Sequence, residues 1–186
     1  FGPTINNVDG TFQRQSIRNL PTPNSALRQL FPWFKKVLGV YHSPYLPHDK
    51  APPNAAKVEC LSGSAMMVKA AAFADVGLLD EDFFLYGEDI DFCKRLLDAG
   101  WESWFVPSPP IMHYGGASSE NRSIRSGVHF YSAAHKYYVK HFARGGFLPV
   151  ITSIFVLGGV WLRCAMDLAG LILRRRLQPG GIKPRL

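Results

Sequence analysis

The apolar and polar positions along the chain predict several short strands. Residues 57–69 alternate loosely between the two kinds, which predicts a strand, a break at Ser62-Gly63-Ser64 and a second strand. Residues 101–107 predict another strand, which a proline ends. Near the start, residues 1–20 predict a short strand followed by a turn at Asp9-Gly10.

Three segments have the spacing of helices. Residues 69–76 predict a short helix that Gly77 ends, and residues 88–99 predict a longer one that Gly100 ends. The apolar face of the longer helix is expected at Ile90, Cys93 and Leu97, with Leu96 beside them. A third helix is expected from about Ser126 to Phe142. Seven prolines make residues 21–57 mostly loop, with one or two short helices between residues 24 and 39.

The segment 147–173 is strongly apolar and begins with sixteen residues that carry no charge, FLPVITSIFVLGGVWL. A helix that crosses a membrane needs about twenty apolar residues. In a helical projection, small and charged residues fall in one narrow stripe: Thr152, Gly159, Arg163, Asp167, Gly170 and Arg174. This pattern favours a helix that lies in a membrane interface or packs its stripe on a neighbour. A membrane-spanning helix and a buried pair of helices are the alternatives.

Charge is concentrated at the C-terminal end. The 186 residues carry a formal net charge of +7, and residues 163–186 hold five Arg and one Lys against a single Asp. A basic tail beside an apolar segment indicates an anionic membrane surface rather than nucleic acid, for which the chain has no motif. The three cysteines have no disulfide or zinc spacing, which fits a reducing compartment.

Six acidic residues lie among Phe, Leu and Tyr between Leu78 and Asp91, in the sequence LLDEDFFLYGEDID. Helix capping explains one or two of them. A calcium loop that starts at Asp80 is excluded, because Leu85 stands where glycine is required. The third interpretation is an active site, in which a carboxylate at a helix N-terminus stays ionised and takes a proton from a hydroxyl.

A longer pattern contains this cluster. From Ser62 to Ser119 the chain reads SGSAMMVKAAAFADVGLLDEDFFLYGEDIDFCKRLLDAGWESWFVPSPPIMHYGGASS. It resembles the acceptor-side half of bacterial family 2 glycosyltransferases of the rhamnosyltransferase-like kind, with their FxxVGxxDExFFxYxEDxDxCxRxxxAGW motif. The segment VDGTFQRQSIRNLP near the start is also similar, so the resemblance covers residues 1 to about 120.

The resemblance implies a GT-A fold, an α/β architecture with a Rossmann-like sheet of mixed strands. It implies inverting transfer of a sugar, rhamnose being one candidate, from a nucleotide-diphosphate sugar. By that resemblance Asp89 is the catalytic base, and Glu88 supports it or contacts the acceptor. Asp80 and Glu81 are expected to fix the turn before Phe83-Phe84, with both rings in the core.

The resemblance also implies binding residues. His113 would help to bind a divalent ion, Mg²⁺ or Mn²⁺, and the diphosphate, although a simple hydrogen-bonding role is the alternative. Arg122 is a natural phosphate clamp or a solvated loop residue. Asp91, included among the candidates, is interpreted chiefly as orienting the helix, and His129, His135 and His141 as ordinary. The substrate-binding candidates are Ser62, Gly63, Ser64, Tyr86, Asp91, Ser118 and Arg122.

The first sixty residues lack the Asp-x-Asp metal motif that this family carries upstream. We therefore expect the chain to be the C-terminal portion of a longer protein and to be inactive alone. Residues 1–120 would be the acceptor-side half of the transferase domain, 121–146 a helical extension, and 147–186 a membrane-associated helix and basic tail.

The expected location is the cytoplasmic face of a bacterial inner membrane, peripheral or with one C-terminal membrane helix. There the enzyme would extend a lipid-linked or cell-surface saccharide for cell-wall polysaccharide. Two other functions are kept as alternatives: a non-catalytic, membrane-attached binding domain, and a metal-assisted phosphoryl-transfer enzyme.

Overall fold

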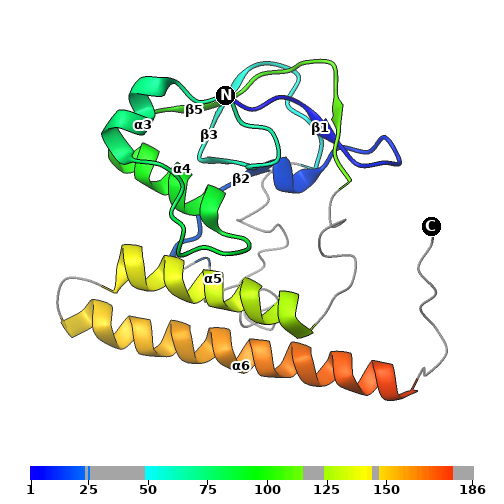
Figure 1. Ribbon diagram of the computed structural model, residues 1–186, viewed down its shortest axis with the longest axis vertical. Coiled ribbons are helices and arrows are strands. Elements are labelled where there is room, and N and C mark those ends of the chain that lie inside the picture. The colour runs from blue at the N-terminus through cyan, green and yellow to red at the C-terminus, as the bar shows by residue number, and fades with distance from the viewer. Residues whose placement is uncertain (24, 26–48, 115–123, 144–146, 178–186) are drawn as a thin grey trace, which may run out of the picture.

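Short strands and two helices form the upper part of the molecule in Figure 1, and a pair of long helices lies beneath them. The computed structural model describes residues 1–23, 25, 49–114, 124–143 and 147–177. The short helices expected between residues 24 and 39 lie almost entirely outside these ranges.

The described strands are paired in twos. β1 (Ile5–Asn6) and β6 (Ile111–Met112) are parallel, with Ile5 opposite Ile111. β2 (Ile17–Arg18) and β4 (Cys60–Leu61) are antiparallel, as are β3 (Ala56–Val58) and β5 (Ser103–Phe105). A further parallel bridge joins Gly2 to Phe105, which places the first residues beside β5. The strands are thus mixed in direction, and the strand predicted at 101–107 is confirmed by β5.

The prediction of a second strand within residues 57–69 is wrong. After β4 the backbone makes a turn and then runs without regular structure to residue 69. Met67 exchanges two backbone hydrogen bonds with Phe1, of 2.8 and 2.9 Å, which is one residue pair rather than a ladder. An alternating pattern becomes a strand only where a partner strand supplies its hydrogen bonds.

The helices of the upper part begin and end close to the predicted residues. η1 (Arg14–Ser16) is a single turn that leads into β2. α3 (Ala70–Val76) ends at Gly77, which has a φ of +77° and donates its N–H to the Phe73 carbonyl. α4 (Glu88–Asp98) is followed by Gly100, whose φ is +84°. Both glycines have a positive φ, which glycine adopts at little cost where a helix ends.

The predicted face of α4 is confirmed at Ile90, Cys93 and Leu96, whereas Phe92 is buried in addition and Leu97 is not buried. Phe92 and Leu96 pack with Ala72 of α3, and Phe92 stacks on Phe73 at 5.3 Å between ring centroids. Cys93 packs on the other side, against Cys60 and Leu20. Leu97 is 42% exposed, because the contact with α3 turns the helix so that Phe92 takes the inner position.

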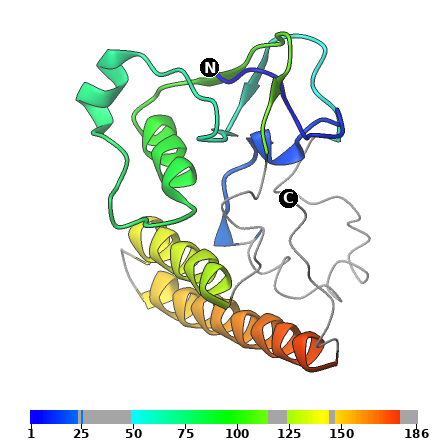
Figure 2. The ribbon, with the colours of Figure 1, turned by 45° about the vertical axis from the view of Figure 1, so that its right-hand side comes forward.

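Two long helices form the lower layer. α5 (Ile124–Phe142) confirms the third predicted helix, and α6 (Phe147–Leu177) covers the apolar segment. They run antiparallel and side by side in Figures 1 and 2. Tyr138 of α5 packs with Val156 and Val160 of α6 in a core of their own. Over the described residues, no helix combines the length and the apolar character that crossing a membrane requires.

The upper side of α5 meets the loop that precedes α4. Ala133 and Tyr137 pack there against Phe83. α5 therefore lies between α6 and the strand-containing part, as Figure 1 shows.

Candidate functional site

The acidic loop begins with a turn that Asp80 organises. Its Oδ1 accepts the N–H of Asp82 at 2.9 Å, and its carbonyl accepts the N–H of Phe83 at 3.1 Å. Phe83 is buried as expected, but Phe84 is 77% exposed and lies against the His129 ring. The expectation that both rings enter the core is wrong, since only Phe83 packs against Ala133 and Tyr137 of α5.

The loop enters α4 through two residues with positive φ. Tyr86 has a φ of +68° and is the one non-glycine residue with this conformation in the described chain. Gly87 follows with a φ of +87°, and a Cβ there would lie 3.1 Å from Phe83 and 3.2 Å from Ala133. Such a conformation persists only where the surroundings enforce it, and it clusters at functional sites. The turn at Tyr86 and Gly87 therefore fixes the direction in which the side chains of Glu88 and Asp89 project from the start of α4.

Asp89 stands in the first turn of α4 and forms an ion pair with Arg18 of β2 through Oδ2. The same oxygen accepts the backbone N–H of Gly63 at 3.0 Å. Both side chains of the pair are only 11% exposed. The contacts with Arg18 and Gly63 hold the carboxylate in one orientation. Sequence reasoning missed Arg18, although it lies in the N-terminal stretch QRQSIRNLP, which belongs to the family resemblance.

Both of these bonds fall on one oxygen of Asp89. Oδ1 makes no hydrogen bond with any of the residues that the structure describes. A carboxylate that is fixed through one oxygen can accept a hydrogen bond or a proton on the other.

The Ser62-Gly63-Ser64 turn lies directly against Asp89. A Cβ on Gly63 would be 3.3 Å from the Asp89 Cβ, closer than most such contacts. The two serines join their hydroxyls at 2.9 Å beside it. The structure thus brings this predicted turn to the predicted base, and its role as a wall of the substrate site stays a prediction.

Glu88 differs from Asp89 in its surroundings. Its Oε2 is buried and has no hydrogen-bond partner within the described residues. Burial raises the pKa of Glu88, the charge of Asp89 adds to this, and Arg18 works against it. A buried, unpaired carboxylate oxygen is costly and gains from any donor that reaches it.

Asp91 is completely buried. It accepts hydrogen bonds from Arg95 Nε, Lys140 Nζ and His141 Nε2, each at 2.8 Å. Burial alone would raise the pKa of Asp91, but these bonds outweigh it and hold the pKa at about 2.

This position bears on two predictions. Asp91 has no exposed surface in the described chain, which fits the helix-orienting interpretation, and its place among the substrate-binding candidates stays a prediction. His141, which the sequence analysis interprets as ordinary, is a partner of Asp91. The spacing of the histidines by six could not reveal this contact, because it depends on how α5 packs against α4.

His113 follows β6 and is partly exposed. Its Nδ1 lies 2.9 Å from Oε1 of the buried Gln13. An amide oxygen that accepts the Nδ1 proton leaves Nε2 free of hydrogen, which is the usual arrangement of a metal-binding histidine. His113 thus fits as one ligand. Within the described ranges, however, no three His, Cys, Asp or Glu side chains gather in a possible metal site.

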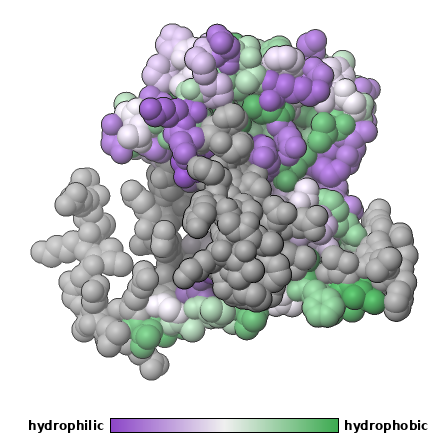
Figure 3. All heavy atoms as spheres, turned by 180° about the vertical axis from the view of Figure 1, so that it is seen from behind, coloured by the Kyte–Doolittle hydropathy of each residue, from purple (hydrophilic) through white to green (hydrophobic). Residues whose placement is uncertain are grey.

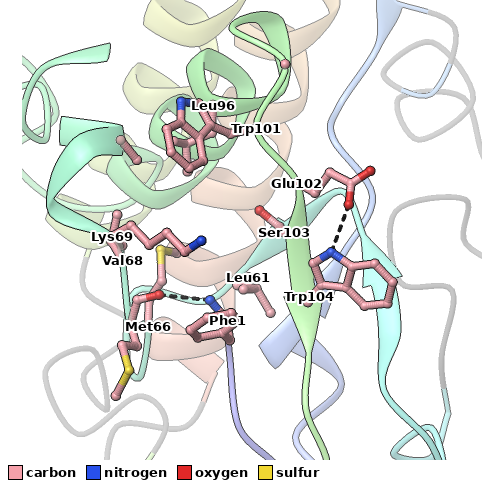
Figure 4. Close-up of a pocket in the computed structure, with 13 residues that line it drawn as sticks. Phe1, Leu61, Met66, Val68, Lys69, Leu96, Trp101, Glu102, Ser103 and Trp104 are labelled. Carbon is pink, nitrogen blue, oxygen red and sulfur yellow. Dashed lines mark hydrogen bonds between the residues drawn. The ribbon is translucent and has the colours of Figure 1, made fainter. Parts of the chain in front are cut away.

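A pocket of about 360 Å³ lies elsewhere, between Phe1, the residues before α3 and the start of β5. Figure 4 shows Phe1 at its floor beside Leu61, with Trp101 and Trp104 on the wall. None of the predicted site residues lines it. The carboxylate site is the better candidate, since the carboxylate that lines the pocket, Glu102, is half exposed and is already paired with Lys57 on the surface. Ser118 and Arg122 lie outside the described residues.

Comparisons with known proteins find glycosyltransferases. The chain is 35% identical over 124 residues to N-acetylglucosaminyl-diphospho-decaprenol L-rhamnosyltransferase of Mycobacterium tuberculosis. That match covers 64% of this chain and 38% of the relative. The rhamnosyltransferase WbbL of Escherichia coli is 37% identical over 83 residues, which is 45% of this chain and 28% of that protein.

A third relative is the low-salt glycan biosynthesis hexosyltransferase Agl10 of Haloferax volcanii, 32% identical over 95 residues, with 51% of this chain and 26% of that protein covered. The chain thus spans well under half the length of these curated relatives, all of which are glycosyltransferases. No family model and no solved structure matches. The glycosyltransferase part of the predicted resemblance is therefore supported.

Proposed function

We propose that this chain supplies the acceptor side of an inverting, family 2 type glycosyltransferase with a GT-A fold. The observation that carries the proposal is the arrangement of Asp89, held by Arg18 and Gly63 through one oxygen while the other accepts nothing from the described residues. It lies in a chain whose relatives are rhamnosyl- and hexosyltransferases.

The proposed step is a direct displacement. An acceptor hydroxyl attacks the anomeric carbon of the donor sugar, and the bond from that carbon to the diphosphate oxygen breaks. The hydroxyl proton passes to Oδ1 of Asp89, and the nucleoside diphosphate leaves from the opposite face of the sugar. A fixed base at hydrogen-bonding distance suits this step, because it needs no rearrangement during the reaction.

Glu88 is proposed to bind the acceptor. Its buried Oε2 has a vacant accepting position, and a second sugar hydroxyl could donate to it. Ser62 and Ser64 would line the same side.

The donor and the metal are further parts of the proposal. The donor would be a nucleotide-diphosphate sugar, and the names of two relatives make an activated rhamnose the candidate. His113 Nε2 would supply one ligand to Mg²⁺ or Mn²⁺, whose charge would neutralise the diphosphate. The acceptor would be a saccharide, carried on a lipid as the name of the mycobacterial relative states for that enzyme.

The test is a transfer assay on the complete gene product, whose upstream coding sequence is read first. With a labelled nucleotide-diphosphate rhamnose and a prenyl-diphosphate-linked saccharide, a glycosidic product of inverted configuration is expected. A phosphate-ester product without sugar transfer would contradict the proposal and favour phosphoryl transfer. Absence of both products, with donor and acceptor still bound, would favour a binding domain.

A further inference from the structure

Between Ile154 and Leu173, the side of α6 that faces away from α5 carries apolar side chains. Phe155, Leu162, Met166 and Leu173 stand seven, four and seven residues apart, so that they share one face of the helix, with Ile154 beside Phe155. They are exposed to 65% at Ile154, 69% at Phe155, 59% at Leu162, 60% at Met166 and 58% at Leu173. Ile154 and Leu173 lie 19 positions apart in the sequence, so the face is about 29 Å long at the usual helical rise.

The charges of this helix lie elsewhere. Arg163 and Asp167 pair with each other at 3.1 Å, and the Tyr131 hydroxyl of α5 donates to Asp167 at 2.5 Å. The only charged side chains between Ile154 and Leu173 are therefore directed toward the α5 side. This arrangement leaves the outer face free of charge.

The outer face is also not needed to hold the hairpin together. Val156, Val160 and Cys164 are the buried side chains of α6 in the described chain, and Val156 and Val160 pack with Tyr138 of α5. A second apolar face on a helix that is already packed marks an interaction surface. Hydrophobic residues gather accordingly along the bottom of the molecule in Figure 3, where α6 lies.

The charge pattern of the sequence identifies the partner. Arg174-Arg175-Arg176 occupies the end of α6, and the segment 163–186 carries six basic residues against one acidic residue. An uncharged face next to a cluster of arginines is complementary to a lipid surface that is apolar inside and anionic at its headgroups. Trp161, 43% exposed near the margin of the face, is of the type enriched at this boundary.

A helical partner fits the face less well. A coiled-coil seam is a narrow stripe, whereas the apolar positions here span an arc from Trp161 to Met166 that covers more than a third of the helix surface. We propose that α6 lies flat on an anionic membrane, with this outer face at the boundary between headgroups and acyl chains. The proposal does not depend on the proposed transfer reaction.

The experiment is flotation of the purified chain with vesicles of phosphatidylcholine, with and without phosphatidylglycerol. The wild-type chain is expected to float with the anionic vesicles, and less with the neutral ones or at high salt. The variant Phe155→Glu/Leu162→Glu is expected to bind at least about tenfold more weakly, because two apolar side chains lose their burial. Val8→Glu is the matched control, since Val8 is also exposed and apolar, at 58%, but lies near β1.

A second variant tests the charge without touching the apolar face. Arg174→Gln/Arg175→Gln/Arg176→Gln is expected to weaken binding to anionic vesicles on the order of a hundredfold at low salt and to change binding to neutral vesicles little. Circular dichroism confirms that each variant is folded.

Fluorescence quenching by brominated lipid reports on depth. Quenching is expected in the wild type, and most of it is expected to disappear in Trp161→Phe. The proposal is overturned if the wild type ignores anionic vesicles, or if the double Glu variant floats as well as Val8→Glu. It is also overturned if the face instead holds a dimer that the double Glu variant dissociates.

Discussion

At the scale of single residues, the site depends on an ion pair that is nearly closed to solvent. Arg18 and Asp89 come from β2 and α4, 71 residues apart in the sequence. Burying two charges is costly, and the contact offsets that cost only while both partners are present. The pair therefore serves to hold the carboxylate in place rather than to add stability.

This view of the pair predicts a strong coupling between its members. In a double-mutant cycle of Arg18→Ala and Asp89→Asn, we expect a coupling of about 1–3 kcal/mol in the free energy of unfolding. Urea unfolding of the four proteins measures it. The pair Lys57–Glu102 is the control, because its side chains are 56% and 50% exposed and its coupling should be under about 1 kcal/mol. Equal coupling in the two cycles would refute the positioning role.

Gly63 offers a second test at this scale. In Gly63→Ala the new methyl group would press on the Asp89 Cβ, which is 3.3 Å away. We expect transfer activity to fall about tenfold or more, since small displacements of a catalytic group are costly. Gly170→Ala is the control, because nothing lies within 4 Å of its Cβ, and it should leave activity unchanged. Wild-type kcat in Gly63→Ala would contradict the close contact.

At the scale of the elements, ion pairs of the buried Asp91 hold α4 in place together with its apolar face. The Asp91 carboxylate accepts hydrogen bonds from Arg95 of the same helix and from Lys140 and His141 of α5. Arg95 also donates to the carbonyls of Val76, the last residue of α3, and of Leu78, two residues further on. This cluster joins three helices beneath the turn that carries Asp89.

The cluster around Asp91 predicts that the free energy of unfolding falls as the pH is lowered. The folded pKa of Asp91 is about 2 against an ordinary 3.8, so its contribution is complete above pH 4 and is lost as the pH falls toward 2. The loss corresponds to about 2 kcal/mol of the free energy of unfolding. Urea unfolding between pH 7 and pH 2 should show this decline in the wild type and a shallower one in Asp91→Asn. Asp98→Asn, altered at a 55% exposed side chain, should keep the wild-type slope.

Much of this element structure could be predicted from the sequence. α3 and α4 were predictable because glycines end them and their periodicity is local. The second strand after Ser62-Gly63-Ser64 was not, because strand formation depends on a partner elsewhere in the chain. The exposure of Leu97 and Phe84 depended on how α4 and the acidic loop pack, which local spacing cannot specify. For the site, Asp89 and Gly63 came from the motif, whereas Arg18 and His141 depended on contacts across the fold.

At the scale of the whole molecule, α5 links the outer helix to the carboxylates. Lys140 contacts Asp80 of the acidic turn as well as Asp91 of α4, and Lys136 donates to the Asp82 carbonyl. On its other side α5 packs against α6 through Tyr138. A membrane that bound α6 would therefore hold the proposed base at a fixed distance from the lipid surface, which suits an acceptor carried on a lipid.

The central claim is that Asp89 is the base of a sugar transfer, and one comparison tests it most directly. The kcat for transfer by the complete gene product is measured for the wild type, for Asp89→Asn and for Asp98→Asn, the exposed acid at the other end of α4. The account predicts a loss of about a hundredfold or more for Asp89→Asn alone, with inverted product and wild-type kcat in the Asp98→Asn control. An Asp89→Asn enzyme that stays within a few-fold of the wild type would contradict it.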